Sequence, residues 1–190
     1  AAHAVSLTPI AVGDTAVVVG AGMIGLCLLQ VLRAAGCSRV FAVDLEAEKL
    51  ELARKLGADS VLDPQKADVA RAVAEATEGR GADVAFEAVG ITATVQTAIG
   101  AVRRGGTVTL VGNLSPLVEV PLQAVVTRQL RLQGSCSIAG EYPAALALIE
   151  RGVVDVDAMR SAVAPLAEGA AWFDRLYKKE RGLMKVILKP

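Results

Sequence analysis

Histidine and cysteine are scarce in this chain of 190 residues, and their scarcity excludes most metal sites. The single histidine is His3, and the three cysteines, Cys27, Cys37 and Cys136, share no close spacing. A structural zinc site needs four clustered Cys or His ligands, and a catalytic one needs about three. We therefore expect no metal ligands within this chain. An odd number of scattered cysteines among apolar residues also predicts reduced, buried thiols and a cytoplasmic protein.

The chain also lacks a surplus of either charge, with 20 Lys and Arg against 20 Asp and Glu. This balance argues against nucleic acid and against an anionic membrane surface as partners. The longest apolar run, 16–29, is shorter than the roughly 20 residues of a membrane-spanning helix, and Gly20, Gly22 and Gly25 interrupt it. It is better interpreted as a buried strand, a glycine turn and a helix. No initiator Met begins the chain, so we expect that an upstream part is missing.

Apolar runs and amphipathic segments alternate along the chain at regular spacing, which is typical of a parallel sheet covered on both faces. The predicted strands are 16–19, 40–43, 61–62, 84–87, 108–111 and a sixth, edge-type strand near 128–134, where Leu130 and Leu132 alternate with polar residues. The predicted helices between them are about 24–35, 47–56, 69–76 and 95–102, with Gly105-Gly106 as the turn before the fifth strand. This pattern predicts an α/β fold, a doubly wound six-stranded parallel sheet of the Rossmann type. The tail departs from it, with helices at 142–151 and around Trp172 and a last strand at 186–188.

A glycine turn follows the first strand and opens the first helix, and its spacing is that of a dinucleotide site. The turn is a G-x-G-x-x-G, and Asp44 lies nineteen residues beyond it at the end of the second strand. In such a turn the first glycine permits the bend, the second lets a pyrophosphate approach the backbone, and the third lets helix and strand pack. The helix N-terminus then faces the phosphates. The predicted contacts from this turn are Gly20, Gly22, Met23, Ile24 and Gly25.

The residues after the second strand favour NAD over NADP. The Asp44 carboxylate can accept hydrogen bonds from the adenosine ribose hydroxyls, but it would repel a 2′-phosphate, and Leu45 brings no compensating guanidinium. Lys49 could also reach the ribose; equally, it could be an ordinary solvated helix lysine.

The ends of the remaining strands are further candidates, because ligands of doubly wound sheets lie beyond the carboxyl ends of the strands. Glycines there indicate either close approach of a flat ligand or ordinary turns. No histidine is available to activate Cys136 as a nucleophile, so we predict no catalytic residue in this chain. The candidate contacts are Ala88, Val89, Gly90, Val111, Gly112, Ser135 and Cys136.

Several motifs, taken in order, resemble those of the zinc-dependent medium-chain alcohol and polyol dehydrogenases. They are Val12-Gly13-Asp14-Thr15 running into the glycine turn, Val43-Asp44 with Lys49, Ala53 and Leu56-Gly57-Ala58, Gly81-Ala82-Asp83-Val84, Glu87-Ala88-Val89-Gly90, Arg104-Gly105-Gly106 and the closing Lys185-Val186-Ile187-Leu188-Lys189-Pro190. The resemblance covers essentially the whole chain, but only the nucleotide-binding part of that family's proteins.

The resemblance implies a division of the chain and a function for the intact protein. Residues 1–158 would be the NAD-binding domain, and 159–190 a returning segment that completes an absent N-terminal catalytic domain holding the zinc. The intact enzyme would transfer a hydride between an alcohol and NAD, whereas this chain alone would be inactive. Many polyol dehydrogenases have an aromatic-Arg pair where this chain has Cys136-Ser137, so only a primary or secondary alcohol is supported. The family also joins subunits through the sixth-strand edge, which predicts a homo-oligomer.

Three alternatives stay open at this point. The first is a dinucleotide-sensing regulatory domain without catalysis, and the second is a fragment of a zinc-less medium-chain reductase. The third is a methyltransferase, which also combines a glycine turn with an acidic residue after the second strand.

Overall fold

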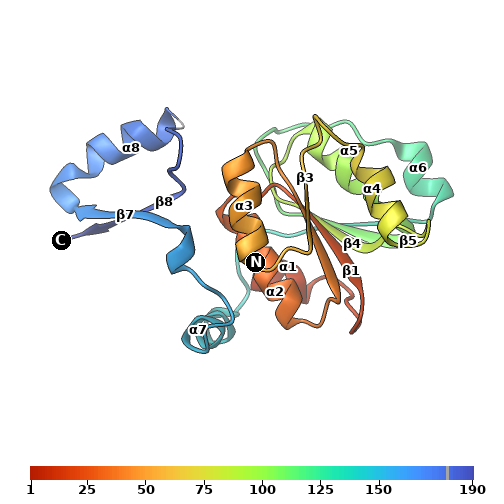
Figure 1. Cartoon of the computed structure of the whole chain (residues 1–190), viewed down its shortest axis with the longest axis horizontal. Coiled ribbons are helices and arrows are strands. Elements are labelled where there is room, and N and C mark those ends of the chain that lie inside the picture. The colour runs from red at the N-terminus through yellow and green to blue at the C-terminus, as the bar shows by residue number, and fades with distance from the viewer. Residues whose placement is uncertain (179) are drawn as a thin grey trace. The chain divides into compact units, whose positions relative to one another are not determined.

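The computed structural model describes residues 1–178 and 180–190, and it contains two compact units. We call Ala1–Val154 the sheet unit and Asp155–Pro190 the tail unit. The sheet unit is an α/β fold with helices around a central sheet (Figure 1). Its parallel strands lie in the order β3-β2-β1-β4-β5-β6. This order confirms the predicted doubly wound sheet. Its strands are β1 (Thr15–Val19), β2 (Arg39–Val43), β3 (Ser60–Leu62), β4 (Ala82–Glu87), β5 (Val102–Leu110) and β6 (Arg131–Gly134).

Helices cover both faces of this sheet because successive residues of a strand point to opposite sides. Val17 and Val19 of β1 share one core cluster with residues of the fourth and fifth helices. Val18, between them, lies on the side of the second helix, close to Gly25. Every residue of β1 and β4 is buried, as expected for the central strands. The helices of the sheet unit are α1 (Ala2–Ser6), α2 (Met23–Ala34), α3 (Ala47–Lys55), α4 (Val69–Ala76), α5 (Thr92–Ala101), α6 (Leu122–Thr127) and α7 (Tyr142–Glu150).

The prediction was wrong at the junction of α5 and β5. Val102 was expected in the helix and Gly105-Gly106 in a turn, but β5 begins at Val102 and runs through both glycines with a register shift against β4. The cause lies further along the chain. The Arg128 guanidinium donates hydrogen bonds to the carbonyls of Ile99 and Val102, which satisfies the end of α5 and lets Val102 become extended.

The sixth strand is shorter than predicted. It begins at Arg131, and the N–H of Leu130 donates to the carbonyl of Val125 at the end of α6 rather than to the sheet. Gln129 has a left-handed backbone (φ 55°), which turns the chain between helix and strand. Leu130 therefore packs against the core from a turn.

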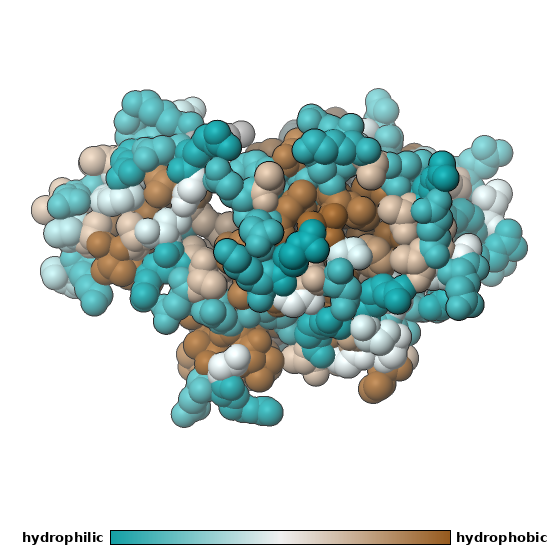
Figure 2. Space-filling model, in the orientation of Figure 1, coloured by the Kyte–Doolittle hydropathy of each residue, from teal (hydrophilic) through white to brown (hydrophobic). Residues whose placement is uncertain are grey.

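The tail unit is small and buries few of its own side chains. Strands β7 (Arg160–Pro165) and β8 (Lys185–Lys189) form a parallel pair, and α8 (Gly169–Tyr177) lies between them in the chain, with 3₁₀ turns at Asp157–Met159 and Leu166–Glu168. Its large apolar side chains are mostly exposed: Phe173 is 72% and Tyr177 is 87% exposed. Apolar surface also shows among the polar side chains of both units in Figure 2.

Within the part of the chain that the structure describes, none of the helices combines the length and apolar character that a membrane crossing requires.

Candidate dinucleotide site

The carboxyl ends of β1, β2, β4, β5 and β6 lie at one edge of the sheet because all of these strands are parallel. The strand order reverses between β1 and β4, the position at which doubly wound sheets bind ligands. The glycine turn follows β1 directly, so it lies at this switch point. The predicted contact residues therefore lie in the turns and in the first turns of α2 and α3 along one edge, which we call the switch edge.

A different physical constraint applies at each glycine of the turn. Gly20 has a left-handed backbone (φ 98°), and a Cβ there would lie 2.6 Å from Cγ2 of Val89. A Cβ on Gly25 would lie 1.8 Å from the carbonyl oxygen of Gly20, so only glycine lets α2 pack on the end of β1. A Cβ on Gly22 would meet nothing within 4 Å. Space is thus open beside the residue where a ligand is expected.

The N-terminus of α2 opens beside this space without a capping side chain. Gly22 is the N-cap residue, and no acidic residue occupies the first turn. The first backbone N–H groups of a helix have no partner inside the helix, and together with the helix dipole they favour an anion. Met23 and Ile24 lie in this first turn.

Asp44 ties the end of β2 to the glycine turn, a role that its position in the sequence did not reveal. Its Oδ2 accepts the N–H of Ala21 at 2.7 Å, and its Oδ1 accepts the N–H of Glu46 at 3.0 Å. A carboxylate has about four acceptor sites, so capacity remains for ribose hydroxyls. Leu45 is 58% exposed, and Lys49 pairs with Glu46 at 2.8 Å, as a surface helix lysine does.

Glu87 organises the next turns of the switch edge, although the sequence did not predict it as a site residue. The side chain is fully buried at the end of β4, and Oε1 accepts the N–H groups of Val89 and Gly90 at 2.9 and 2.8 Å. The main-chain oxygen of Glu87 accepts the N–H groups of Val111 and Gly112. One residue therefore holds the turns after both β4 and β5. The sequence signal was a carboxylate directly after the apolar run 84–86.

Those two turns touch through glycines. A Cβ on Gly90 would lie 2.4 Å from the N of Asn113, and one on Gly112 would lie 2.2 Å from the N of Gly90. The close approach here is between two backbone segments of the protein. The structure thus supplies a packing reason for both glycines, and contact with a ligand stays a prediction.

A pocket of about 550 Å³ opens along the carboxyl ends of β5 and β6. It brings together the predicted residues Ile24, Val111, Gly112, Ser135 and Cys136. Ala4 of α1 and the N-cap residue Ala1 also line it, and nothing in their sequence pattern indicated this. The other predicted contacts do not line this pocket: Gly20, Gly22, Met23, Gly25, Asp44, Leu45, Lys49 and the turn 88–90.

The cysteines do not share one environment. Burial raises the pKa of the Cys27 thiol, and burial with the negative charges of Asp14 and Asp83 raises that of Cys37 to about 11. The expectation that all three are buried holds for Cys37 alone. Cys27 is half-buried, and Cys136 is exposed because it follows the edge strand β6. In the described residues, no three or more His, Cys, Asp and Glu side chains gather closely enough to hold a metal ion.

Comparison with known proteins relates this geometry to a family. Residues 24–151 match the family model of the zinc-binding dehydrogenases. D-xylulose reductase A of Aspergillus niger is 33% identical over 192 residues, which are 98% of this chain and 53% of that protein. The chain spans about half the length of the curated relatives it matches.

Two solved structures have the same fold over nearly the whole chain. The 2R,3R-butanediol dehydrogenase of Bacillus subtilis superposes with a TM-score of 0.91 at 31% identity, covering 100% of this chain and 54% of that one. A zinc-binding dehydrogenase structure from Sinorhizobium meliloti 1021, bound to NADP, gives a TM-score of 0.89 at 31% identity, covering 99% and 56%.

Proposed function

Because this chain belongs to the zinc-binding dehydrogenase family, we propose that it is the dinucleotide-binding part of an oxidoreductase that transfers a hydride between an alcohol and NAD. The observation that carries the proposal is the glycine turn of β1 and α2, which leaves open space at Gly22 and is held by the Asp44 carboxylate. The relatives that act on xylulose and butanediol, by their names, support an alcohol as substrate.

The residues present fit a dinucleotide. The backbone N–H groups of Met23 and Ile24 would hold the pyrophosphate, and Asp44 would hold the adenosine ribose through its remaining acceptor sites. The turns 88–90 and 111–112, with Ser135 and Cys136, would position the nicotinamide half. NAD, once bound, supplies the carbon that accepts or gives the hydride.

We propose NAD rather than NADP, although one relative binds NADP. The Asp44 carboxylate would lie close to a 2′-phosphate, and the exposed Leu45 offers it no positive charge.

The described residues do not fit a zinc ion, since they contain no cluster of ligands for one. No step of the reaction is therefore assigned to zinc in this chain. We propose that the zinc ligands belong to a catalytic domain outside this sequence and that residues 159–190 contribute to that domain. The exposed apolar side chains of the tail unit support this assignment.

Calorimetric titration of the chain with NADH, NADPH and S-adenosylmethionine tests the proposal. NADH should bind saturably and S-adenosylmethionine should not; the opposite result would favour a methyltransferase.

Gly22→Ala should abolish NADH binding because the new methyl group occupies the space beside the turn. Gly100→Ala, whose Cβ would make an ordinary 3.6 Å contact with Ala70, is the matched control and should bind like the parent.

The double variant Asp44→Ser, Leu45→Arg should shift the preference toward NADPH by about 1–3 kcal/mol, the value of a charge-assisted hydrogen bond. An unchanged NADH to NADPH ratio would refute the ribose assignment. No alcohol should be oxidised by the chain alone, with or without added zinc.

A further inference from the structure

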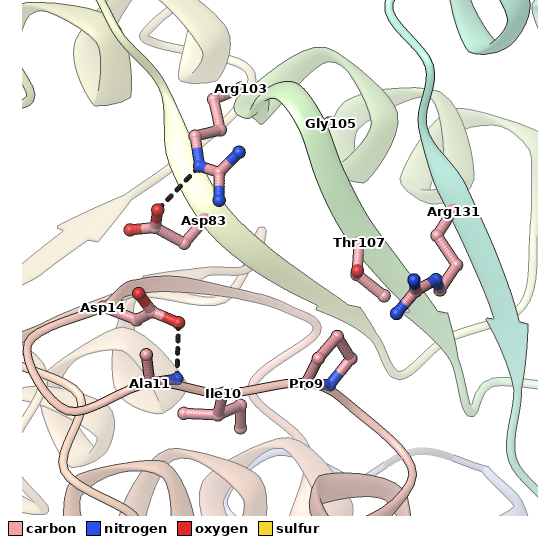
Figure 3. A pocket seen from close by; sticks show the side chains of 9 residues that line it. All are labelled: Pro9, Ile10, Ala11, Asp14, Asp83, Arg103, Gly105, Thr107 and Arg131. Carbon is pink, nitrogen blue, oxygen red and sulfur yellow. Dashed lines mark hydrogen bonds and ion pairs between the residues drawn. The ribbon is translucent and has the colours of Figure 1, made fainter.

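A second pocket lies at the opposite end of the strands from the switch edge. It has a volume of about 370 Å³ and is formed by the first residues of β4 and β6, the middle of β5 and the loop 9–14 (Figure 3). None of the residues assigned to the dinucleotide lines it. Any ligand of this pocket would therefore be a different molecule.

Thr107 and Arg131 enter this pocket side by side. They are paired neighbours on the parallel strands β5 and β6, so their side chains project from the same face of the sheet. Figure 3 shows the Thr107 hydroxyl and the Arg131 guanidinium reaching toward the pocket from adjacent strands. The two groups thus form one polar wall.

The Thr107 hydroxyl reaches the pocket, and the described residues offer it no hydrogen-bond partner. The residue is only 4% exposed, and in the described residues its side chain makes no hydrogen bond. Thr109, two residues along on the same face, shows the usual arrangement, because its hydroxyl hydrogen-bonds to that of Thr8 at 2.6 Å. The Thr107 oxygen is not among the fully buried polar atoms, so its donor and acceptor sites are accessible from the pocket. A ligand in the pocket would supply the missing hydrogen bond.

The charges around the pocket favour an anion. Asp83 is already neutralised by Arg80 at 2.6 Å and Arg103 at 2.7 Å. Asp14 accepts the N–H of Ala11. Within the described part of the chain, Arg131 has no acidic partner. The surroundings of the pocket therefore contain three guanidinium groups and two carboxylates. The guanidinium group without an acidic partner, that of Arg131, lies beside Thr107.

We propose that this pocket binds the oxyanion of a small molecule, a phosphate or a carboxylate, between the Arg131 guanidinium and the Thr107 hydroxyl. A guanidinium donates two parallel hydrogen bonds to such a group, and the hydroxyl donates a third. The pocket has room for on the order of ten waters at about 30 Å³ each, so it also accommodates the remainder of a small polar molecule. This proposal does not depend on the dinucleotide function.

The test is a titration of the ¹⁵N-labelled full chain with inorganic phosphate and, separately, malonate at constant ionic strength. Saturable shifts of the Thr107, Arg131 and Ile10 amides with either anion are expected, and the tighter anion identifies the class. Arg131→Gln should weaken that binding at least 10-fold. The isosteric Thr107→Val should weaken it about 3-fold to 10-fold and keeps the test decisive if Arg131→Gln fails to fold.

Arg104→Gln is the matched control, because Arg104 is exposed, carries the same charge and does not line the pocket. It should leave the affinity within 2-fold of the parent. The proposal is overturned by shifts that do not saturate, by equal losses in Arg131→Gln and Arg104→Gln, or by saturable shifts confined to the glycine turn.

Discussion

The sheet unit and the tail unit differ in how completely each buries its own apolar side chains. In the sheet unit, large side chains such as Phe41, Phe86 and Leu26 are fully buried among strands and helices. In the tail unit, Phe173, Tyr177 and Leu166 are each more than half exposed. An isolated two-stranded sheet is marginally stable at best, and a unit below about 40 residues rarely supports its own core. We therefore expect the sheet unit to fold by itself and the tail unit to need another surface for stability.

The largest expected effect comes from separating the two units. A chain ending at Val154 should unfold cooperatively with nearly the parental midpoint and should retain NADH binding. The peptide 155–190 should be largely unfolded, because its few buried side chains cannot offset the entropy of ordering it. Circular dichroism with thermal denaturation measures both. A cooperative unfolding transition in the isolated peptide would contradict the expectation that only the sheet unit folds by itself.

Glycine substitutions sharpen the comparison inside each unit. Gly25→Ala should destabilise the sheet unit by about 3 kcal/mol, since its methyl group would collide with a rigid backbone oxygen. Gly169→Ala in the tail unit brings a Cβ to 3.0 Å from Leu188 Cδ1, the end of a flexible side chain, and should change stability by less than about 1 kcal/mol. Urea denaturation measures the first, and hydrogen exchange of the α8 amides measures the second. Equal costs would mean that both units are packed alike.

Ion pairs provide a third contrast between the two units, in how their contribution to stability depends on pH. Burial alone would raise the pKa of Asp83, but hydrogen bonds from Arg80, the Thr15 N–H and Arg103 outweigh it and hold the value at about 2. Because the folded pKa lies below the unfolded one, the stabilisation, on the order of 2 kcal/mol, is present above about pH 4 and disappears as the pH falls toward 2.

The stability gap between the parent and Asp83→Asn should therefore close over that pH range in urea melts. In the tail unit, the exposed Arg175 lowers the pKa of Glu180. Glu180→Gln should nevertheless leave stability nearly unchanged, because exposed ion pairs contribute little. A gap for Asp83→Asn that is independent of pH would contradict the assignment.

The edge strand β6 also has exposed pairing groups, since within the described residues no strand pairs with its outer backbone groups. The Ser135 N–H donates inward to Leu110, so alternation places the N–H of Gly134 on the outer side. If two copies pair along this edge, Gly134→Pro should weaken the dimer by about 1 kcal/mol for each lost hydrogen bond.

Gly134→Ala is the matched control, because a Cβ there meets nothing within 4 Å and the N–H is retained. Sedimentation at micromolar concentration compares the two variants. A monomeric parent, or a dimer insensitive to the proline, would contradict pairing through this edge.

Where local pattern decides the structure, the sequence was a good guide. The buried run before Gly20, the glycine spacing and Asp44 predict β1, α2 and the end of β2, because each depends on residues close in the chain. The start of β5 could not be predicted, because the carbonyls of Ile99 and Val102 accept hydrogen bonds from Arg128, 26 residues after Val102. The role of Glu87 was hidden for a similar reason. Its partners in the β5 turn lie more than 20 residues ahead, and no periodic pattern marks a buried carboxylate.

The contact between Gly90 and Gly112 has a consequence for how this protein can vary. Each glycine occupies the space that a side chain on the other turn would need, and Glu87 accepts hydrogen bonds from the backbone of both turns. Neither position can accept a larger residue unless the opposite turn moves, and the turn cannot move while the carboxylate holds it. A library of random substitutions should therefore show almost no tolerated changes at these three positions, while the adjacent exposed Leu114 accepts many. Sequence variation along the switch edge is then confined to side chains that face solvent. The backbone conformation of the two turns must be kept or changed as a whole.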